Sequence, residues 1–245
     1  MYKVVIIDDE PLARQLIRTL LATYEQIEIV GEGTDGFEGF KEIQKQQPDL
    51  VFLDVQMPRI NGFEMLELLD PLPSVIFTTA FDEYAMKAFE ANAIDYLLKP
   101  ITKERFDKAL QKWFAFTSST EDISKQTIIT ENVYEGYRNR IVVKDNSRIL
   151  IIQDHEIEYI EASDDYVKIY TKTEKFLKKS TLSFIEQSLN PQQFIRVHRS
   201  YLIPVNRIVK LEPYEKDSIV AILQNGSKVP VSKSGLAKLK ETLGW

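Results

Sequence analysis

The stretch DLVFLDVQMPRING, residues 49–62, decides the fold of the first half of this chain. Its apolar run Leu50–Leu53 carries no charge and then meets a carboxylate, Asp54. Such a run is typical of a strand in a parallel sheet, which helices cover on both faces. A carboxylate left unpaired inside that layer is costly, because it loses its hydration. We therefore expect Asp54 to end the strand at a polar edge of the sheet.

The rest of residues 1–115 alternates between β-branched apolar runs and apolar residues at helical spacing. Strands are predicted at residues 3–7, 27–33, 50–54, 74–78 and 93–98. Helices are predicted at residues 12–21, 35–43, 62–69, 83–90 and 102–113. Repeated strand–helix units predict an α/β fold, a doubly wound five-stranded parallel sheet with helices on both faces.

From residue 138 onward the apolar period changes to two, which is typical of half-buried antiparallel strands. Strands are predicted at residues 140–143, 147–152, 158–161, 166–171, 175–178, 208–213, 218–223 and 228–231. Helices are predicted at residues 183–189 and 234–243. We expect a mainly antiparallel β domain at residues 138–245, joined to the first domain by a linker at 116–137 that holds a short strand at 126–130.

Charge is divided unevenly between these two parts. Residues 1–137 contain 13 Lys and Arg against 24 Asp and Glu, whereas residues 138–245 contain 18 against 13. An acidic half joined to a basic half suggests two domains with different partners. The chain has no cysteine, which excludes disulfides and thiolate metal sites. No apolar run approaches the roughly 20 residues of a membrane span, so we expect a cytoplasmic protein without a membrane partner.

Polar residues follow the predicted strands of the first half. Asp8 and Asp9 follow the first strand, Asp54 ends the third, and Thr79 and Lys99 follow the last two. In a doubly wound sheet these carboxyl ends meet at the edge where ligands bind. Carboxylate oxygens suit Mg²⁺, and a carboxylate beside that cation can attack phosphorus. Each residue alone has a plainer explanation as a cap, a strand end or a surface charge, but the set favours a phosphoryl-transfer site.

Three segments resemble the receiver domain of two-component response regulators: VVIIDDEPLAR at 4–14, VFLDVQMPRINGFEML at 51–66 and IFTTAFDEYAMKAFEANAIDYLLKP at 76–100. The resemblance covers about residues 1–115. It implies that Asp54 accepts a phosphoryl group from a phosphohistidine of a sensor histidine kinase. It also implies that Asp9, Asp54 and the backbone carbonyl of Gln56 hold Mg²⁺, with Asp8 acting nearby.

The same resemblance assigns a switch pair, Thr79 and Tyr96, whose hydroxyl and ring move when the acceptor is phosphorylated. Lys99 matches the family's phosphoryl-binding lysine, followed by a proline after a cis peptide bond. A half-buried packing role remains the alternative for Tyr96. A free-standing hydrolase of the haloacid-dehalogenase type is disfavoured, because such enzymes have a second aspartate where this chain has Gln56.

The second half resembles a LytTR-type DNA-binding domain over residues 138–243. The segments that carry this resemblance are EIEYIEASDDYVKIYT at 156–171, KSTLSFIEQSL at 179–189, FIRVHRSYLIPVNRIVKLEP at 194–213 and GSKVPVSKSGLAKLKETL at 226–243. The family's asparagine near the end of the third motif is displaced here to Asn206, a departure in local spacing. No helix-turn-helix pattern is visible.

Three loops or strand ends contain the candidate DNA contacts: Asp165, Tyr166 and Lys168, then Arg199, then Ser232 and Lys233. Arg199 is the best base reader, because a guanidinium can bind guanine O6 and N7 together. Ser232 and Lys233 precede a predicted helix and suit phosphate contacts. Asp165 either accepts from a cytosine amine or points away from the duplex. His198 is better explained as a hydrogen-bonded packing residue.

We interpret the chain as a phosphorylation-controlled transcription regulator and not as an enzyme. The expected partners are a sensor histidine kinase and double-stranded DNA with paired half-sites, which a homodimer binds on activation. An alternative is a receiver-gated protein-interaction module that never binds DNA. A receiver-gated enzyme is disfavoured, because residues 138–245 have no cysteine and no Gly-rich phosphate loop.

Overall fold

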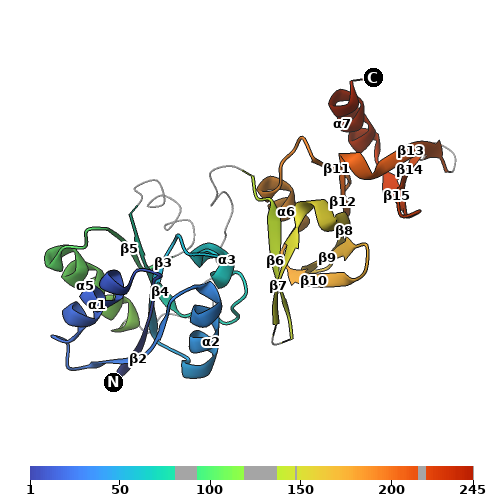
Figure 1. Ribbon diagram of the computed structural model, residues 1–245. Coiled ribbons are helices and arrows are strands. Elements are labelled where there is room, and N and C mark those ends of the chain that lie inside the picture. Colours follow the sequence, from blue (N-terminus) through green and yellow to red (C-terminus); the bar gives the residue numbers. More distant parts are fainter. Residues whose placement is uncertain (81–92, 119–136, 147, 215–218, 245) are drawn as a thin grey trace. The chain divides into compact units, whose positions relative to one another are not determined.

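The computed structural model describes residues 1–80, 93–118, 137–146, 148–214 and 219–244 (Figure 1). The chain divides into two compact units, Met1–Val133 and Tyr134–Trp245, each with its own sheets and core. No helix of the described residues is long and apolar enough to cross a membrane. The helix predicted at 83–90, the short strand at 126–130 and most of the predicted linker lie outside the described residues.

The first unit is built on a five-stranded parallel sheet with the order β2-β1-β3-β4-β5. Its strands are β1 (Tyr2–Ile7), β2 (Ile27–Gly33), β3 (Leu50–Asp54), β4 (Ser74–Thr79) and β5 (Asp95–Leu98). Every residue of β3 is buried, as its continuous apolar run requires of a central strand. This architecture confirms the predicted fold class of the first half.

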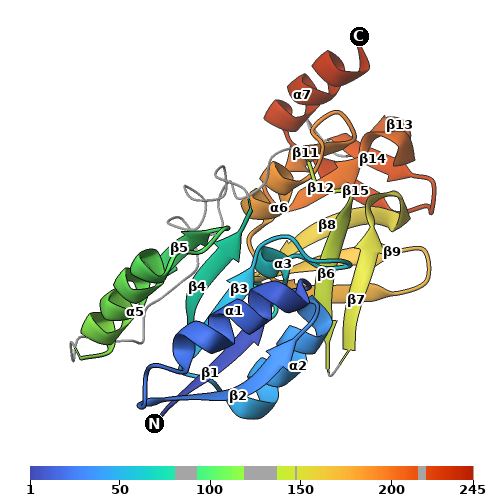
Figure 2. The same ribbon diagram turned by 60° about the vertical axis from the view of Figure 1, so that its left-hand side comes forward.

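Helices cover both faces of this sheet (Figure 2). They are α1 (Pro11–Leu21), α2 (Gly36–Gln46), α3 (Gly62–Leu66) and α5 (Lys103–Ser118). The Asp35 side chain accepts hydrogen bonds from the Phe37 and Glu38 backbone N–H groups and so caps α2. The α3 helix is shorter than the predicted 62–69, because Leu68 and Leu69 bond to carbonyls three residues back instead of four.

Alternate residues of the central strands fill the core on the two sides of the sheet. Trp113 and Phe106 of α5 pack against Phe52 and Ile76 on one side, and the Phe52 and Phe106 rings stack at 5.3 Å. The α5 helix continues to Ser118, five residues past its predicted end. Because both faces are covered, polar side chains can collect only where the strands end.

The described residues of the second unit form three antiparallel sheets. The largest has the order β10-β9-β8-β12-β11, and the others are β13-β14-β15 and β6-β7. The strands of these three sheets are β6 (Arg140–Asp145), β7 (Arg148–Gln153), β8 (Ile157–Ser163), β9 (Tyr166–Thr171), β10 (Lys175–Lys179), β11 (Phe194–His198), β12 (Tyr201–Pro204), β13 (Ile208–Pro213), β14 (Ile219–Leu223) and β15 (Lys228–Val231). The mainly antiparallel prediction is confirmed, although β11 and β12 were not among the predicted strands.

The described residues of this unit also form the helices α6 (Leu182–Ser188) and α7 (Lys233–Leu243) and the 3₁₀ turns η2 (Asp154–Glu156) and η3 (Val205–Arg207). The α7 helix lies directly on β11. A Cβ atom added at Gly235 would be 2.0 Å from the Val197 carbonyl oxygen, so only glycine allows this approach. The beginning of α7 is therefore held against the end of β11.

Candidate functional site

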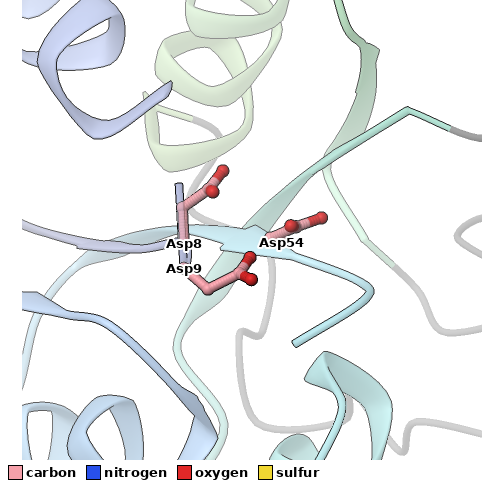
Figure 3. A group of neighbouring side chains, drawn as sticks. All are labelled: Asp8, Asp9 and Asp54. Carbon is pink, nitrogen blue, oxygen red and sulfur yellow. The ribbon is translucent and has the colours of Figure 1, made fainter. Parts of the chain in front are cut away.

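Three carboxylates meet at the carboxyl edge of the parallel sheet (Figure 3). Oxygen atoms of Asp8, Asp9 and Asp54 all lie within 4.8 Å of one another. The strands β1 and β3 are neighbours with Ile7 opposite Leu53, so the residues that follow them meet. Asp8 and Asp54 are buried, whereas Asp9 is exposed. The edge therefore has two carboxylates inside the fold and one facing solvent.

Lys99 is the cation that faces this cluster. Its Nζ lies 2.9 Å from Asp8 Oδ2, 3.4 Å from Asp54 Oδ2 and 3.5 Å from Glu10 Oε2. The backbone N–H of Lys99 donates to the Thr79 carbonyl at 2.7 Å, which places the lysine at the end of β4. Among the residues that the structure describes, one ammonium faces Asp8, Asp54 and Glu10, so the described part of this edge carries a net negative charge.

The pKa values of the site report this excess of negative charge. Burial, reinforced by the charge of Asp8, raises the pKa of Asp54 to about 7. Burial also raises the pKa of Asp8, against the opposing effect of Lys99. Burial alone would lower the pKa of Lys99, but its contacts with Asp8 and Asp54 raise it. A further positive charge at this edge would stabilise the ionised carboxylates.

The other predicted receiver residues lie close to this edge in the fold. Thr79 is fully buried at the end of β4, and the preceding Thr78 is opposite Asp54. Gln56 is exposed, and its backbone N–H lies 3.4 Å from Asp54 Oδ1. Tyr96 is buried in β5, so it is more enclosed than a half-buried strand residue. The Tyr96 carbonyl accepts a hydrogen bond from the Arg105 guanidinium at 2.8 Å.

Sequence reasoning missed one residue that shapes this edge, Gly62. A Cβ atom at Gly62 would lie 2.4 Å from the Asp54 carbonyl oxygen. The backbone N–H of Gly62 donates to the Val55 carbonyl at 2.9 Å, so the loop after β3 folds back onto Asp54. The available signal was a glycine at the end of a polar loop and at the start of a helix, directly after the Asn61 cap.

The candidate DNA contacts of the second unit collect at one end of its largest sheet. Arg199 is exposed in the turn between β11 and β12. The Ala162 N–H donates to the Ser200 carbonyl at 2.8 Å, and Tyr201 is opposite Glu161, so the β8–β9 turn lies at the same end. That turn and the start of β9 contain Asp165, Tyr166 and Lys168.

The start of α7 joins the same end. Val197 in β11 accepts two hydrogen bonds at its carbonyl, from the Ser232 N–H at 2.8 Å and the Ser232 hydroxyl at 3.0 Å. Ser232 also caps α7 by accepting from the Gly235 N–H, and the next residue, Lys233, is exposed. The structure therefore brings all three predicted segments together, although they are separated by more than 30 residues in sequence.

His198 lies among these residues, and none of its contacts with described residues is with a carboxylate. Its Nδ1 accepts a hydrogen bond from the Ser200 N–H at 3.2 Å, and its ring lies 5.9 Å from that of Tyr201. Burial, together with the charges of Arg199 and Arg196, lowers the pKa of His198. A neutral, hydrogen-bonded imidazole agrees with the packing role expected from the sequence.

Comparison with known proteins decides the family. Residues 4–111 match the response regulator receiver domain, and residues 147–244 match the LytTr DNA-binding domain. The transcriptional regulatory protein BtsR of Escherichia coli strain K12 is 40% identical over 248 residues, which cover 100% of both chains. The chain belongs to the LytTR response regulators. This response regulator therefore joins a receiver domain to a DNA-binding domain, and the resemblance seen in the sequence is confirmed.

Two further relatives extend over the same length. The sensory transduction protein LytT of Bacillus anthracis is 33% identical over 246 residues, which cover 99% of each chain. An uncharacterized response regulatory protein of Vibrio cholerae is 37% identical over 247 residues, which cover 100% of each chain. The family is one of two-component transcription regulators and not of enzymes. A receiver implies a histidine kinase partner, and a LytTR domain implies DNA binding.

Proposed function

We propose that this response regulator is phosphorylated on Asp54 and that phosphorylation controls sequence-specific DNA binding by its second domain. The observation that supports the first step is the cluster of Asp8, Asp9 and Asp54, whose oxygens lie within 4.8 Å of one another beside Lys99. Asp54 supplies the nucleophilic oxygen. A bond forms from that oxygen to phosphorus, while the bond from phosphorus to the histidine nitrogen of the kinase breaks.

The donor set of this edge fits Mg²⁺, because it offers hard oxygen ligands and lacks enough positive charge. Asp9, Asp54 and the Gln56 carbonyl would hold the ion, with Asp8 nearby. The ion, when bound, offsets the charge that develops on the phosphoryl oxygens. Lys99, whose Nζ lies 3.4 Å from Asp54 Oδ2, would bind one phosphoryl oxygen, and Thr79 would donate its hydroxyl to another. With Tyr96, Thr79 forms the switch that reports the phosphorylated state.

We assign residues 1–115 to the receiver, 116–137 to the linker and 138–245 to the DNA-binding domain. In the last of these, Arg199 reads guanine through its guanidinium. Ser232 and Lys233 contact phosphate oxygens at the start of α7. The neighbouring β8–β9 turn and the start of β9 provide the further proposed DNA contacts, Asp165, Tyr166 and Lys168. The support for this face is that the three segments lie at one end of the sheet.

Activation acts through dimerisation. Two phosphorylated receivers pair, and the paired DNA-binding domains then occupy two half-sites. Linking two modest DNA contacts raises the effective concentration of the second, which is how pairing increases affinity without any new contact to the duplex. An output that binds only protein is disfavoured, because residues 147–244 match a DNA-binding domain.

The test is a selection of bound duplexes from random DNA, with the full-length protein and with or without a small-molecule phosphoryl donor. We expect enrichment of two similar half-sites, stronger when the donor is present. Binding of the enriched duplex should weaken steeply with salt, because phosphate contacts release counterions. Failure to enrich any sequence in either condition would contradict the DNA-binding role. Enrichment that ignores the donor, and persists in Asp54→Ala, would contradict the control by phosphorylation.

A further inference from the structure

We propose that Arg196 and Glu186 are positioning residues that hold the Arg199 turn and the beginning of α7 in one fixed arrangement for DNA recognition. The inference rests on the proposed DNA contacts of Arg199, Ser232 and Lys233, and it names residues that act through them. Neither Arg196 nor Glu186 is expected to touch the duplex itself.

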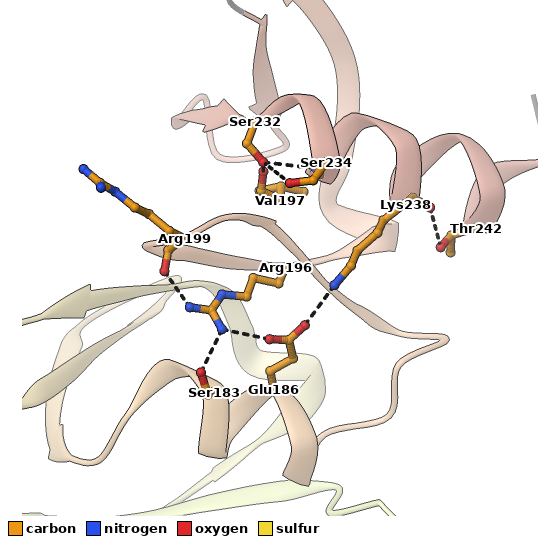
Figure 4. A network of polar contacts seen from close by, with 10 residues as sticks. Ser183, Glu186, Arg196, Val197, Arg199, Ser232, Ser234, Lys238 and Thr242 are labelled. Atoms are coloured by element: carbon orange, nitrogen blue, oxygen red, sulfur yellow. Dashed lines mark hydrogen bonds and ion pairs between the residues drawn. The ribbon is translucent and has the colours of Figure 1, made fainter.

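Arg196 ties the Arg199 turn to α6 (Figure 4). Its Nη2 donates to the backbone carbonyl of Arg199 at 2.7 Å. Its Nη1 donates to Glu186 Oε2 at 3.0 Å and to the Ser183 hydroxyl at 2.9 Å, both on α6. A guanidinium is a planar fork, so fixing one side of it against α6 also fixes where the other side can meet the turn. The position of the Arg199 backbone is thereby tied to α6, the helix that precedes β11.

Glu186 joins α7 to the same group of contacts. Its Oε1 lies 3.4 Å from Lys238 Nζ, while its Oε2 accepts from Arg196. The side chains of Arg196 and Glu186 are only 24% and 29% exposed, so their attraction is less screened than that of a surface pair. One carboxylate therefore holds both the strand that precedes the turn and the helix that begins with Lys233.

A second attachment lies one residue further along β11. The Val197 carbonyl accepts from both the N–H and the hydroxyl of Ser232. Consecutive residues of β11 thus hold the two parts of the proposed DNA face. Arg196 binds the Arg199 turn, and Val197 binds Ser232 at the beginning of α7. The strand pairing is irregular between Arg196 and His198, so the ladder alone does not hold this stretch in register.

The reading side chain itself is directed away from these contacts. Figure 4 shows the Arg199 side chain extending away from the network, while its carbonyl receives the Arg196 bond. A base contact requires the guanidinium to reach a base edge with fixed geometry, and a long side chain achieves this only from a fixed backbone. Holding the turn before binding also reduces the ordering cost on association. Arg196 and Glu186 supply this holding.

The test compares binding of the enriched duplex from the selection with binding of a shuffled duplex of equal composition, using full-length protein. Glu186→Gln is the informative variant, because loss of the charge and loss of the holding contact predict different changes in DNA binding. Removal of a negative charge alone would tighten binding to both duplexes. Loss of the holding contact should instead lower the ratio of enriched to shuffled affinity about fivefold. Glu241→Gln on α7 makes the same charge change at an exposed position and is the matched control.

Arg196→Gln should lower the same ratio about tenfold, whereas the control Arg148→Gln, an exposed arginine on β7, should lower both affinities and leave the ratio unchanged. A double-mutant cycle then asks whether Arg196 acts through Arg199. In the Arg199→Ala background, Arg196→Gln should produce little further loss, because the side chain that it positions is already gone. Thermal unfolding of each variant separates this effect from loss of the fold, and Glu186→Gln serves if Arg196→Gln does not fold.

The inference is overturned if Glu186→Gln behaves like Glu241→Gln, or if the effects of Arg196→Gln and Arg199→Ala on selectivity simply add. A wild-type protein that does not distinguish the two duplexes would overturn the proposed function together with this inference. A selective wild type whose selectivity depends on Arg199 but is unchanged in Arg196→Gln and Glu186→Gln would overturn this inference alone.

Discussion

The receiver edge and the proposed DNA-facing end of the second domain differ in how they arrange charge. The receiver brings like charges together inside the fold, where Asp8 and Asp54 are buried within reach of one lysine, Lys99. The second domain keeps its proposed reader, Arg199, exposed and holds its backbone by hydrogen bonds. In the proposed function, the first site receives a cation and a phosphoryl group. The second is prepared to offer a cation to an anionic partner.

The two sites also differ in how their charges are balanced before a ligand binds. In the receiver, burial and the charge of Asp8 raise the pKa of Asp54, and a bound cation would favour the ionised carboxylates. In the second domain the neighbouring Glu186 is satisfied by Arg196 and Lys238, so the unliganded end is already ordered. A switch suits the first kind of site, and a preformed reading surface suits the second.

The largest expected effect is that of Asp54→Asn, which should abolish acyl-phosphate formation. An amide has no nucleophilic carboxylate oxygen, so no label should be acquired from a phosphoryl donor. Intact-protein mass spectrometry after incubation with the donor measures this directly. Asp49→Asn, at the exposed residue that precedes the same strand, is the matched control and should still gain the phosphoryl group. Retention of the label in Asp54→Asn would show that the acceptor is elsewhere.

The second effect concerns the DNA-facing end. Arg199→Ala should weaken binding to the enriched duplex by about 1–3 kcal/mol, with a smaller loss on shuffled DNA. Lys233→Ala should weaken both duplexes alike and reduce the salt slope by about 1, as expected of a phosphate contact. Fluorescence anisotropy at several salt concentrations measures both. If the two variants lost the same selectivity, the division into base and phosphate contacts would be wrong.

The third effect tests how closely the loop after β3 lies against the acceptor. Gly62→Ala places a Cβ atom 2.4 Å from the Asp54 carbonyl oxygen, which is closer than van der Waals contact allows, so the backbone must move. We expect a loss of about 1–3 kcal/mol in the free energy of unfolding, together with slower phosphorylation. Urea denaturation and the rate of label uptake measure these.

Gly31→Ala is the matched control for that variant. Its added Cβ atom would clash with the end of the flexible Glu42 side chain, at 2.6 Å, which can turn away, and would make an ordinary contact with Gln46 Cγ at 3.6 Å. An equal loss in both variants would mean that glycine is required for chain flexibility in general and that the contact with Asp54 is unimportant.

The smallest effect is a pH dependence of receiver stability in the presence of a chelator. Burial raises the pKa of Asp54 to about 7, and that of Asp8 moves in the same direction. The native state therefore binds more protons than the unfolded chain, so the receiver gains stability as pH falls through about 7 toward the ordinary aspartate range. Asp54→Asn should show a weaker dependence. Thermal unfolding at several pH values measures it, and identical profiles for both proteins would contradict the assignment.

Much of the receiver could be read from the sequence, because helical and strand periods alternate clearly there. Three helices, α2, α3 and α5, end three or more residues away from their predicted ends. Two of these differences have local causes: α3 tightens into three-residue turns, and α5 continues because Phe114 and Phe116 still find core contacts. In the second domain β11 and β12 escaped prediction. They are short strands of five and four residues, separated only by Arg199 and Ser200, and the polar turn obscured their alternation.

The sequence by itself determined that Asp8, Asp9, Asp54, Thr79 and Lys99 would meet, because every parallel strand ends at the same edge of a doubly wound sheet. Only the tertiary structure decided which segments share the DNA-facing end. Period-two patterns are compatible with many antiparallel strand orders, and only the packed structure has the order β8-β12-β11. The same packing brings Ser232 into hydrogen-bonding distance of the Val197 carbonyl. For the same reason Arg196 and Glu186 look like ordinary surface charges in the sequence, and they become partners only when β11 and α6 are packed together.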